Sequence, residues 1–151
     1  MKKFSLTDLI TSVVIAELAG AVSGVIAGDF RTLYSRIIQP PLSPPAIVFP
    51  VVWAVLYALM GVSAYLIKRK KPDILKIYII QLAVNFSWSI VFFRLRMFLL
   101  SSIVAITLLI LVGIMIMRFC KVSKPAAAMN VPYLLWSAFA VYLASAIYIL
   151  N

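Results

Sequence analysis

Four side chains have types and a spacing that suit the wall of a ligand site. At positions i, i+4, i+7 and i+11 of one segment stand Gln81, Asn85, Trp88 and Phe92. This spacing puts all four on one face of a helix. In a membrane an amide without a partner is costly, so the face should point into a bundle of helices. The two amides predict either hydrogen bonds between helices or contacts with a ligand, and both roles can hold together.

Two further predicted helices carry similar stripes on one face each. Their members are Trp53, Tyr57 and Met60 on the first, and Tyr133, Trp136 and Ala140 on the second. Taken alone, an aromatic stripe is typical of a lipid-interface belt or of core packing. Three stripes directed at one centre instead favour a cavity with flat walls, in which a few polar groups orient a guest molecule.

Residue types also exclude several kinds of chemistry. The sequence has no histidine and a single cysteine, Cys120, so a His-based triad, a haem histidine ligand and an internal disulfide are excluded. No carboxylates cluster with the aromatic stripes, so acid–base and nucleophilic catalysis have no evident participants. The sequence therefore predicts no catalytic residue of the conventional kinds, no metal site and no cofactor.

The composition indicates which elements must position these side chains. Hydrophobic residues make up 65% of the chain and charged residues 12%, against about 25% charged in an average soluble domain. Five segments are long enough to span a bilayer, at residues 6–28, 47–67, 74–93, 97–117 and 126–150. We therefore predict an all-α fold, an integral membrane bundle of five transmembrane helices in one domain, residues 1–151. Only residues 94–96 join spans three and four, which predicts a tight helical hairpin.

Basic residues are distributed unevenly between the two sides of this bundle. Of the 14 lysines and arginines, ten fall on the side of the N-terminus and four on the other side. The ten are Lys2, Lys3, Lys68, Arg69, Lys70, Lys71, Lys76, Arg118, Lys121 and Lys124, and the four are Arg31, Arg36, Arg94 and Arg96. The positive-inside rule then predicts a cytoplasmic N-terminus and a C-terminus outside. Anionic lipid headgroups account for the net charge of +10, so no nucleic-acid partner is expected.

The first span carries a stripe of small residues with an acid beside it. Ala16, Gly20, Gly24 and Gly28 recur at every fourth position, a pattern that permits close approach of another helix. That helix belongs either to the same monomer or to a second copy. Glu17 is a functional candidate because acids are rare inside a membrane. The alternative is a protonated or hydrogen-bonded carboxyl between helices.

The connection between the first two spans is unusually rich in proline. Five of the eight prolines lie there or just beyond, at Pro40, Pro41, Pro44, Pro45 and Pro50. Proline fixes φ and removes a hydrogen-bond donor. A segment stiffened in this way loses less entropy when it is held in one shape. We name residues 37–47 the strap.

The strap and the stripes together resemble the TspO/MBR family, the tryptophan-rich sensory proteins of bacteria and the mitochondrial translocator protein. The resemblance runs over residues 31–151 and rests on motifs in the same order and on the same spans. The strap region reads LYSRIIQPPLSPP (33–45), and the second span reads PVVWAVLYALMG (50–61). The third span carries NFSWSIVFF (85–93), and the fifth carries PYLLWSAFA (132–140) before a terminal Asn151.

The resemblance implies that the strap is a lid loop over the outer mouth of the bundle and closes a ligand pocket. The residues implied to bind the ligand are Tyr34, Pro44, Pro45, Phe49, Trp53, Tyr57, Asn85, Trp88, Phe92, Tyr133, Trp136 and Ala140. Family ligands include porphyrins such as protoporphyrin IX and haem, sterols and synthetic benzodiazepine-site compounds. Membrane lipid and a second copy of the chain, in a homodimer, are the other implied partners.

The lid departs from the family pattern. Leu33 and Leu42 replace two tryptophans, and Gln39 replaces a lysine. Losing two rings removes stacking surface, so we expect porphyrin to bind in the micromolar range or more weakly, about −8 kcal/mol or less favourable. By the same argument, Leu42→Trp should tighten binding.

The resemblance implies three functions that the residues leave open. The first is a membrane receptor or binding protein for porphyrins and similar flat molecules, in tetrapyrrole homeostasis or stress signalling. The second is an enzyme that degrades porphyrin with light and oxygen, with Trp53 and Trp136 as electron donors. The third is a porphyrin or lipid transporter, which five spans without an inverted repeat do not favour.

Overall fold

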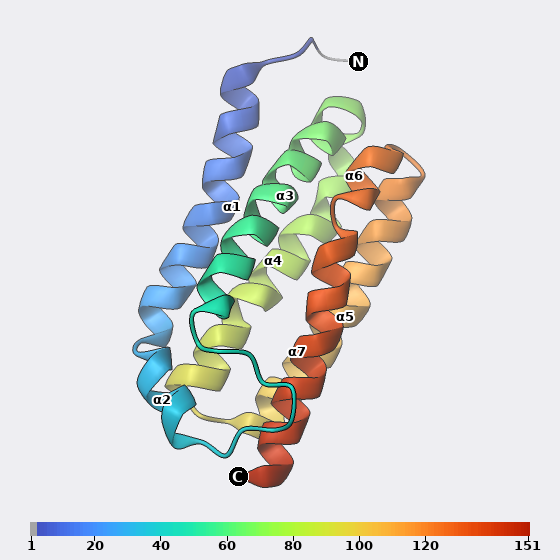
Figure 1. Cartoon of the computed structure of the whole chain (residues 1–151). Helices are drawn as coiled ribbons and strands as arrows, with labels where there is room; N and C mark the ends of the chain where they lie inside the picture. The colour runs from blue at the N-terminus through green and yellow to red at the C-terminus, as the bar shows by residue number, and fades with distance from the viewer. Residues whose placement is uncertain (1–2) are drawn as a thin grey trace.

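The computed structural model describes residues 3–151 as a bundle of long helices (Figure 1). Five stretches are long and apolar enough to cross a membrane: α1 (Leu6–Ala27), α3 (Val48–Lys70), Pro72–Arg94, α5 (Phe98–Cys120) and Lys124–Leu150. The predicted all-α five-helix bundle is therefore confirmed, with ends within three residues of the predicted ones. The two termini lie at opposite ends of the bundle. Lys2, one of the ten basic residues counted above, lies outside the described residues.

Two of the five spans are not uniform helices. The third consists of a 3-10 turn η1 (Pro72–Ile74), α4 (Leu75–Ser89) and a π-helical turn η2 (Ile90–Arg94). The fifth consists of α6 (Lys124–Ala128) and α7 (Val131–Leu150). Proline near the start of α7, at Pro132, cannot donate a backbone hydrogen bond to a continuous helix.

The break between α6 and α7 is stabilised by a buried amide. Nδ2 of Asn130 donates to Ala126 O at 2.8 Å and to Ser63 Oγ on α3 at 2.6 Å, and the hydroxyl of Ser63 donates to the same carbonyl. The break is thus tied to α3 by bonds that the local sequence does not reveal. Neither this break nor the π-helical turn was predicted.

Helices α1 and α3 touch at one end and separate toward the other. A Cβ atom on Gly61 would lie 2.5 Å from Cα of Val13, so the two backbones are in contact there. Further along α1, a Cβ atom on Gly20 would meet the ring of Tyr57 at 2.2 Å. At Gly24, one turn later, such an atom would meet no heavy atom within 4 Å in the described part of the chain. The small-residue stripe therefore serves close packing at one end and leaves space at the other.

The segment between α1 and α3 begins with a short helix, α2 (Phe30–Arg36), which was not predicted. The side chain of Asp29 caps it by accepting hydrogen bonds from the hydroxyl and, at 3.2 Å, the backbone N–H of Thr32. These bonds hold the pKa of the Asp29 carboxyl below its usual value. Gly28 precedes the cap with φ of +85°, a conformation that favours glycine.

The strap crosses the end of the bundle that carries the C-terminus (Figure 1). Asn151 pairs with Ile38 in both directions: its Oδ1 accepts from Ile38 N at 2.9 Å and its Nδ2 donates to Ile38 O at 3.0 Å. The hydroxyl of Tyr142 donates to Pro41 O at 2.6 Å. On the other side, Tyr34 Oη donates to Pro44 O at 2.7 Å. The strap is thus held by α7 and α2, as a lid loop requires.

Candidate ligand pocket

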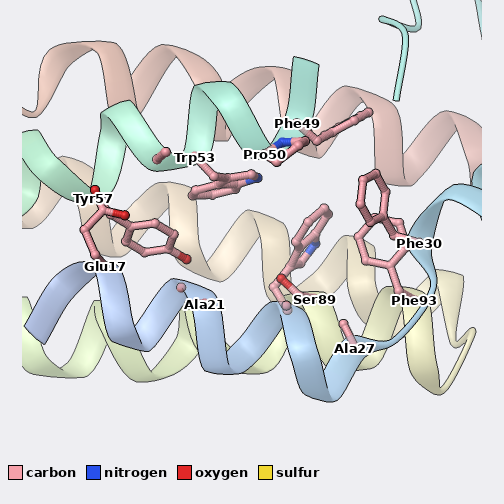
Figure 2. A pocket seen from close by; sticks show the side chains of 14 residues that line it. Glu17, Ala21, Ala27, Phe30, Phe49, Pro50, Trp53, Tyr57, Ser89 and Phe93 are labelled. Atoms are coloured by element: carbon pink, nitrogen blue, oxygen red, sulfur yellow. The ribbon is translucent and has the colours of Figure 1, made fainter. Parts of the chain in front are cut away.

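A cavity of 320 Å³ lies between α1, α3 and the third span, beside α2 (Figure 2). Its walls combine small residues of α1 with aromatic residues of the other elements. The lining consists of Glu17, Gly20, Ala21, Gly24 and Ala27 from α1, Phe30 from α2, Phe49, Pro50, Trp53, Ala54 and Tyr57 from α3, and Trp88, Ser89 and Phe93 from the third span. Its volume is at the lower end of the range for small-molecule sites.

The cavity opens sideways, toward the lipid. Ala21, Gly24 and Pro50 line it and are exposed, and they lie on facing parts of α1 and α3. The opening follows from the separation of these helices beyond Gly20.

The two ends of the cavity differ in chemistry. Figure 2 shows Glu17 and Tyr57 at one end, Phe30 and Phe93 at the other, and Trp53 between them. The second end is apolar, whereas the first carries a carboxyl group. The cavity therefore has a carboxyl group at one end and aromatic rings at the other.

Four of the predicted site residues line this cavity: Phe49, Trp53, Tyr57 and Trp88. Trp53 stacks on Tyr57, with ring centroids 5.5 Å apart and ring planes 30° apart. That these side chains contact a ligand stays a prediction.

The face around Asn85 forms a buried hydrogen-bonded network. Tyr57 Oη donates to Asn85 Oδ1, and Asn85 Nδ2 donates to Tyr133 Oη at 2.8 Å. Tyr133 Oη in turn donates to Gln81 Oε1 at 2.8 Å, while Gln81 Nε2 lies 3.8 Å from the Met60 sulfur. Asn85 and Tyr133 thus link α3, α4 and α7, and the structure favours the interhelical role of the two amides.

The centre of the bundle beneath the strap differs from the prediction. We expected one cavity walled by spans two, three and five, but aromatic rings fill this region. The ring of Phe49 packs edge-on against Tyr34 and Trp136, with ring centroids 5.2 and 5.9 Å apart. Trp53 packs edge-on against Tyr133, with ring centroids 6.1 Å apart. Aromatic rings gain dispersion energy and bury apolar area by packing on one another. The aromatic stripes therefore occupy the space in which the periodicity of the sequence had suggested a cavity.

The remaining predicted residues lie outside the cavity lining. Trp136 and Pro44 line a separate shallow groove between α3 and α7, and Pro45 is exposed on the strap. Ala140 packs with Trp88 and Phe92 in an apolar cluster, which its small side chain accommodates. Phe92 stacks on Trp88, with ring centroids 5.4 Å apart.

The lid position Leu42 also differs from expectation. Its side chain is 83% exposed, and its φ is +67°, in the left-handed region that favours glycine. It does not line the cavity. The expected gain in affinity from Leu42→Trp therefore has no structural basis here.

The π-helical turn η2 positions part of the aromatic wall. Leu95 N donates to Ile90 O at 2.9 Å, five residues back, as a π-helix requires. Such turns occur frequently at functional sites. Within this turn, Phe92 is buried and its neighbour Phe93 lines the cavity.

Sequence reasoning missed most of the α1 side of the cavity. Gly20 and Gly24 were interpreted as a packing surface, and Glu17 only as a candidate beside it. The available signal was their combination: a small-residue stripe next to an intramembrane acid. Phe30 and Phe93 had no comparable signal, because α2 and the π-helical turn were not predicted.

The indole N–H of Trp88, in the cavity lining, is buried without a hydrogen bond in the described part of the chain. Trp88 is 6% exposed, and its Nε1 has no acceptor among residues 3–151. A buried donor without a partner carries a desolvation cost. The cavity wall therefore contains a donor as well as the Glu17 acceptor.

The chain matches known proteins over almost its whole length. Residues 12–150 match the model of the TspO/MBR family. The chain is 33% identical over 124 residues to the tryptophan-rich protein TspO of Chlorobaculum tepidum, covering 78% of each chain. It is 30% identical over 134 residues to that of Bacillus cereus, covering 86% of this chain and 88% of the relative. It is also 33% identical over 128 residues to the translocator protein of Ovis aries, covering 78% and 74%.

Proposed function

Since the chain belongs to the TspO/MBR family, we propose that it is a membrane receptor or binding protein for porphyrins and related flat hydrophobic molecules. Its role would lie in tetrapyrrole homeostasis or stress signalling. The observation that supports this function best is the side-opening cavity between α1 and α3, walled by Phe49, Trp53 and Trp88.

The geometry suits a flat ligand that enters from the bilayer. One edge of the ring system would enter between α1 and α3 at Gly24, which leaves room, and its face would lie along Trp53. Aromatic pairs contribute about 0.5–1.5 kcal/mol beyond the burial of apolar area. A porphyrin is larger than the cavity, so only one edge is enclosed and the rest stays against lipid.

A titration of protoporphyrin IX in darkness tests this function. The protein is held in lipid nanodiscs, and binding is followed by quenching of tryptophan fluorescence. Gly24→Phe adds a ring at the cavity lining, and it should be tolerated because no described heavy atom lies within 4 Å of the new Cβ. The matched control is Gly113→Phe on α5, whose Cβ is equally unobstructed but lies away from the cavity.

We expect Gly24→Phe to weaken porphyrin binding at least about tenfold, which corresponds to the loss of about 1.4 kcal/mol. Gly113→Phe should bind as the natural chain does. Equal affinity of the two variants would show that this cavity does not hold the porphyrin, and no binding by the natural chain would overturn the function.

Light-dependent degradation of porphyrin is a second candidate, favoured by the position of Trp53 in the cavity wall. Trp136 lines a separate groove, so an electron-donor role would fall on Trp53. In that case Trp53→Phe slows the loss of porphyrin absorbance under light and air, and Trp136→Phe does not. Equal rates in both variants at equal binding would leave a binding function only.

A further inference from the structure

We propose that Glu17 makes the α1–α3 cavity selective for flat molecules that carry a basic nitrogen. The apolar body would lie along Trp53, and the nitrogen would donate a hydrogen bond to the Glu17 carboxylate. The inference rests on the proposed function in one respect: the same cavity must hold a flat apolar ligand. It goes further by naming the chemical group that the cavity selects.

The position of Glu17 is the first reason. The chain has four acidic residues, and the other three lie in the first turn of α1, at the N-cap of α2 and in the 3-10 turn that begins the third span. Glu17 alone lies midway along a span, at the twelfth of the 22 residues of α1. A charge at this depth is costly, and such residues generally mark sites of function.

The lack of an internal partner is the second reason. No hydrogen bond or ion pair reaches the Glu17 carboxyl from residues 3–151. Tyr57 lines the same end of the cavity, and its hydroxyl already donates a hydrogen bond to Asn85. The Glu17 carboxyl is therefore free to accept a hydrogen bond in the cavity, because the Tyr57 hydroxyl donates to Asn85 instead. An interhelical carboxyl that served packing alone would be expected to bond to a facing helix.

The shape of the cavity is the third reason. Phe30 and Phe93 form the end away from Glu17, and small residues of α1 form the side between (Figure 2). Trp88 Nε1 in the same wall is a donor and can pair only with an acceptor, whereas a polar group beside Glu17 meets a carboxylate. Because a carboxylate accepts but does not donate, that group must carry an N–H or O–H donor, and a protonated nitrogen gives the strongest bond.

Acridine and 9-aminoacridine form a suitable pair of probes. Both are flat tricyclic molecules small enough for the cavity, and at neutral pH the second is a cation whereas the first is neutral. The protein is placed in nanodiscs of phosphatidylcholine only, because anionic lipid would itself attract the cation. Binding is measured by quenching of tryptophan fluorescence for the natural chain, Glu17→Gln and Asp8→Asn.

We expect the natural chain to bind 9-aminoacridine about tenfold or more tightly than acridine, as a hydrogen bond to a charged group implies. Glu17→Gln keeps the shape of the side chain but removes its charge, so it should lose the preference and bind the two probes about equally. Asp8→Asn removes the same charge from the same helix outside the cavity, so it should retain the preference. Glu17→Leu should lose the preference as Glu17→Gln does. Because leucine suits a lipid environment, this second variant controls for misfolding of Glu17→Gln.

The outcomes separate this inference from the proposed function. Equal binding of the two probes by the natural chain overturns the inference and leaves the proposed function intact. A preference that survives both Glu17 substitutions also overturns it, since the cation would then bind elsewhere. If the natural chain binds neither acridine nor protoporphyrin, the proposed function would instead be overturned.

Discussion

The glycines of α1 and α3 have different roles, because their missing side chains face different neighbours. The hydrogen atoms of Gly61 face the backbone of Val13, which cannot move aside, whereas Gly24 faces open space. Glycine in a helix lowers the stability of the fold by roughly 0.5–1 kcal/mol relative to alanine, so we expect it where a larger side chain would disturb packing or function. At Gly61 the harm is a clash between helices, and at Gly24 it is a smaller cavity.

This difference predicts opposite effects of the same substitution. Gly61→Ala should destabilise the fold by about 1–3 kcal/mol, because the new methyl group forces α1 and α3 apart. Gly24→Ala should be neutral or stabilising by up to about 1 kcal/mol, because it raises helix propensity without a clash. Thermal unfolding in detergent, followed by circular dichroism, measures both. Equal unfolding temperatures for the two variants would contradict the close contact at Gly61.

The hydroxyl of Tyr133 accepts from Asn85 and donates to Gln81, so both amides depend on it. Tyr133→Phe should cost about 1–3 kcal/mol in unfolding free energy, because it leaves buried polar groups unpaired. Tyr78→Phe is the control: Tyr78 is also buried, but its hydroxyl makes no hydrogen bond within residues 3–151. A cost as large in the control as in Tyr133→Phe would show that the network adds nothing specific.

Among the elements, the strap depends on the end of α7. Both hydrogen-bonding groups of the Asn151 amide pair with the backbone of Ile38, some 113 residues earlier in the chain. Proline reduces the freedom of the strap, and this pairing then fixes where the strap lies over the bundle. Asn151 is therefore hydrogen-bonded to the strap and helps to hold it over the bundle.

Removing this pairing should release the strap without unfolding the bundle. In Asn151→Ala the amide of Ile38 loses its acceptor, so its hydrogen exchange should accelerate about fivefold or more, as loss of roughly 1 kcal/mol implies. The control is Tyr148→Phe, which removes an exposed hydroxyl that makes no hydrogen bond in the described chain. Exchange measured by mass spectrometry on peptides from residues 37–47 reports the result. Unchanged exchange would mean that the prolines alone hold the strap.

The elements that could be predicted are those that a bilayer dictates. A spanning helix satisfies all its backbone groups internally, so hydropathy alone located the five spans. The breaks in spans three and five depend on distant partners, such as Ser63 for Asn130, or on a π-helical turn whose residues include no proline or glycine. Periodicity likewise showed that Trp53 and Tyr133 face inward. It did not show that their rings meet, or that the open space lies on the α1 side instead.

For the whole molecule, we expect a ligand to enter through the opening in the side wall. The strap is tied down by α2 and α7, whereas Ala21 and Pro50 at the opening are exposed between α1 and α3. The cavity lies in the half of the bundle that carries the strap and the C-terminus (Figures 1 and 2). The leaflet that supplies the ligand therefore depends on which end of the bundle faces the cytoplasm.

The distribution of charge predicts this orientation. The end that carries the described N-terminal residue Lys3 also carries Lys68, Arg69, Lys70 and Lys71 at the end of α3, with Arg118 and Lys121 at the end of α5. Each positive charge left on the cytoplasmic side avoids transfer across the membrane potential, which is worth about 2.3 kcal/mol per 100 mV. We therefore expect the strap and Asn151 to lie outside and the ligand to enter from the outer leaflet. Alkaline phosphatase fused after Asn151 should be active, because it requires a non-cytoplasmic environment, and the same enzyme inserted after Lys71 should be inactive. The reverse pattern would place the cavity in the inner leaflet and overturn the orientation, while the fold, whose termini lie at opposite ends in either case, would stand.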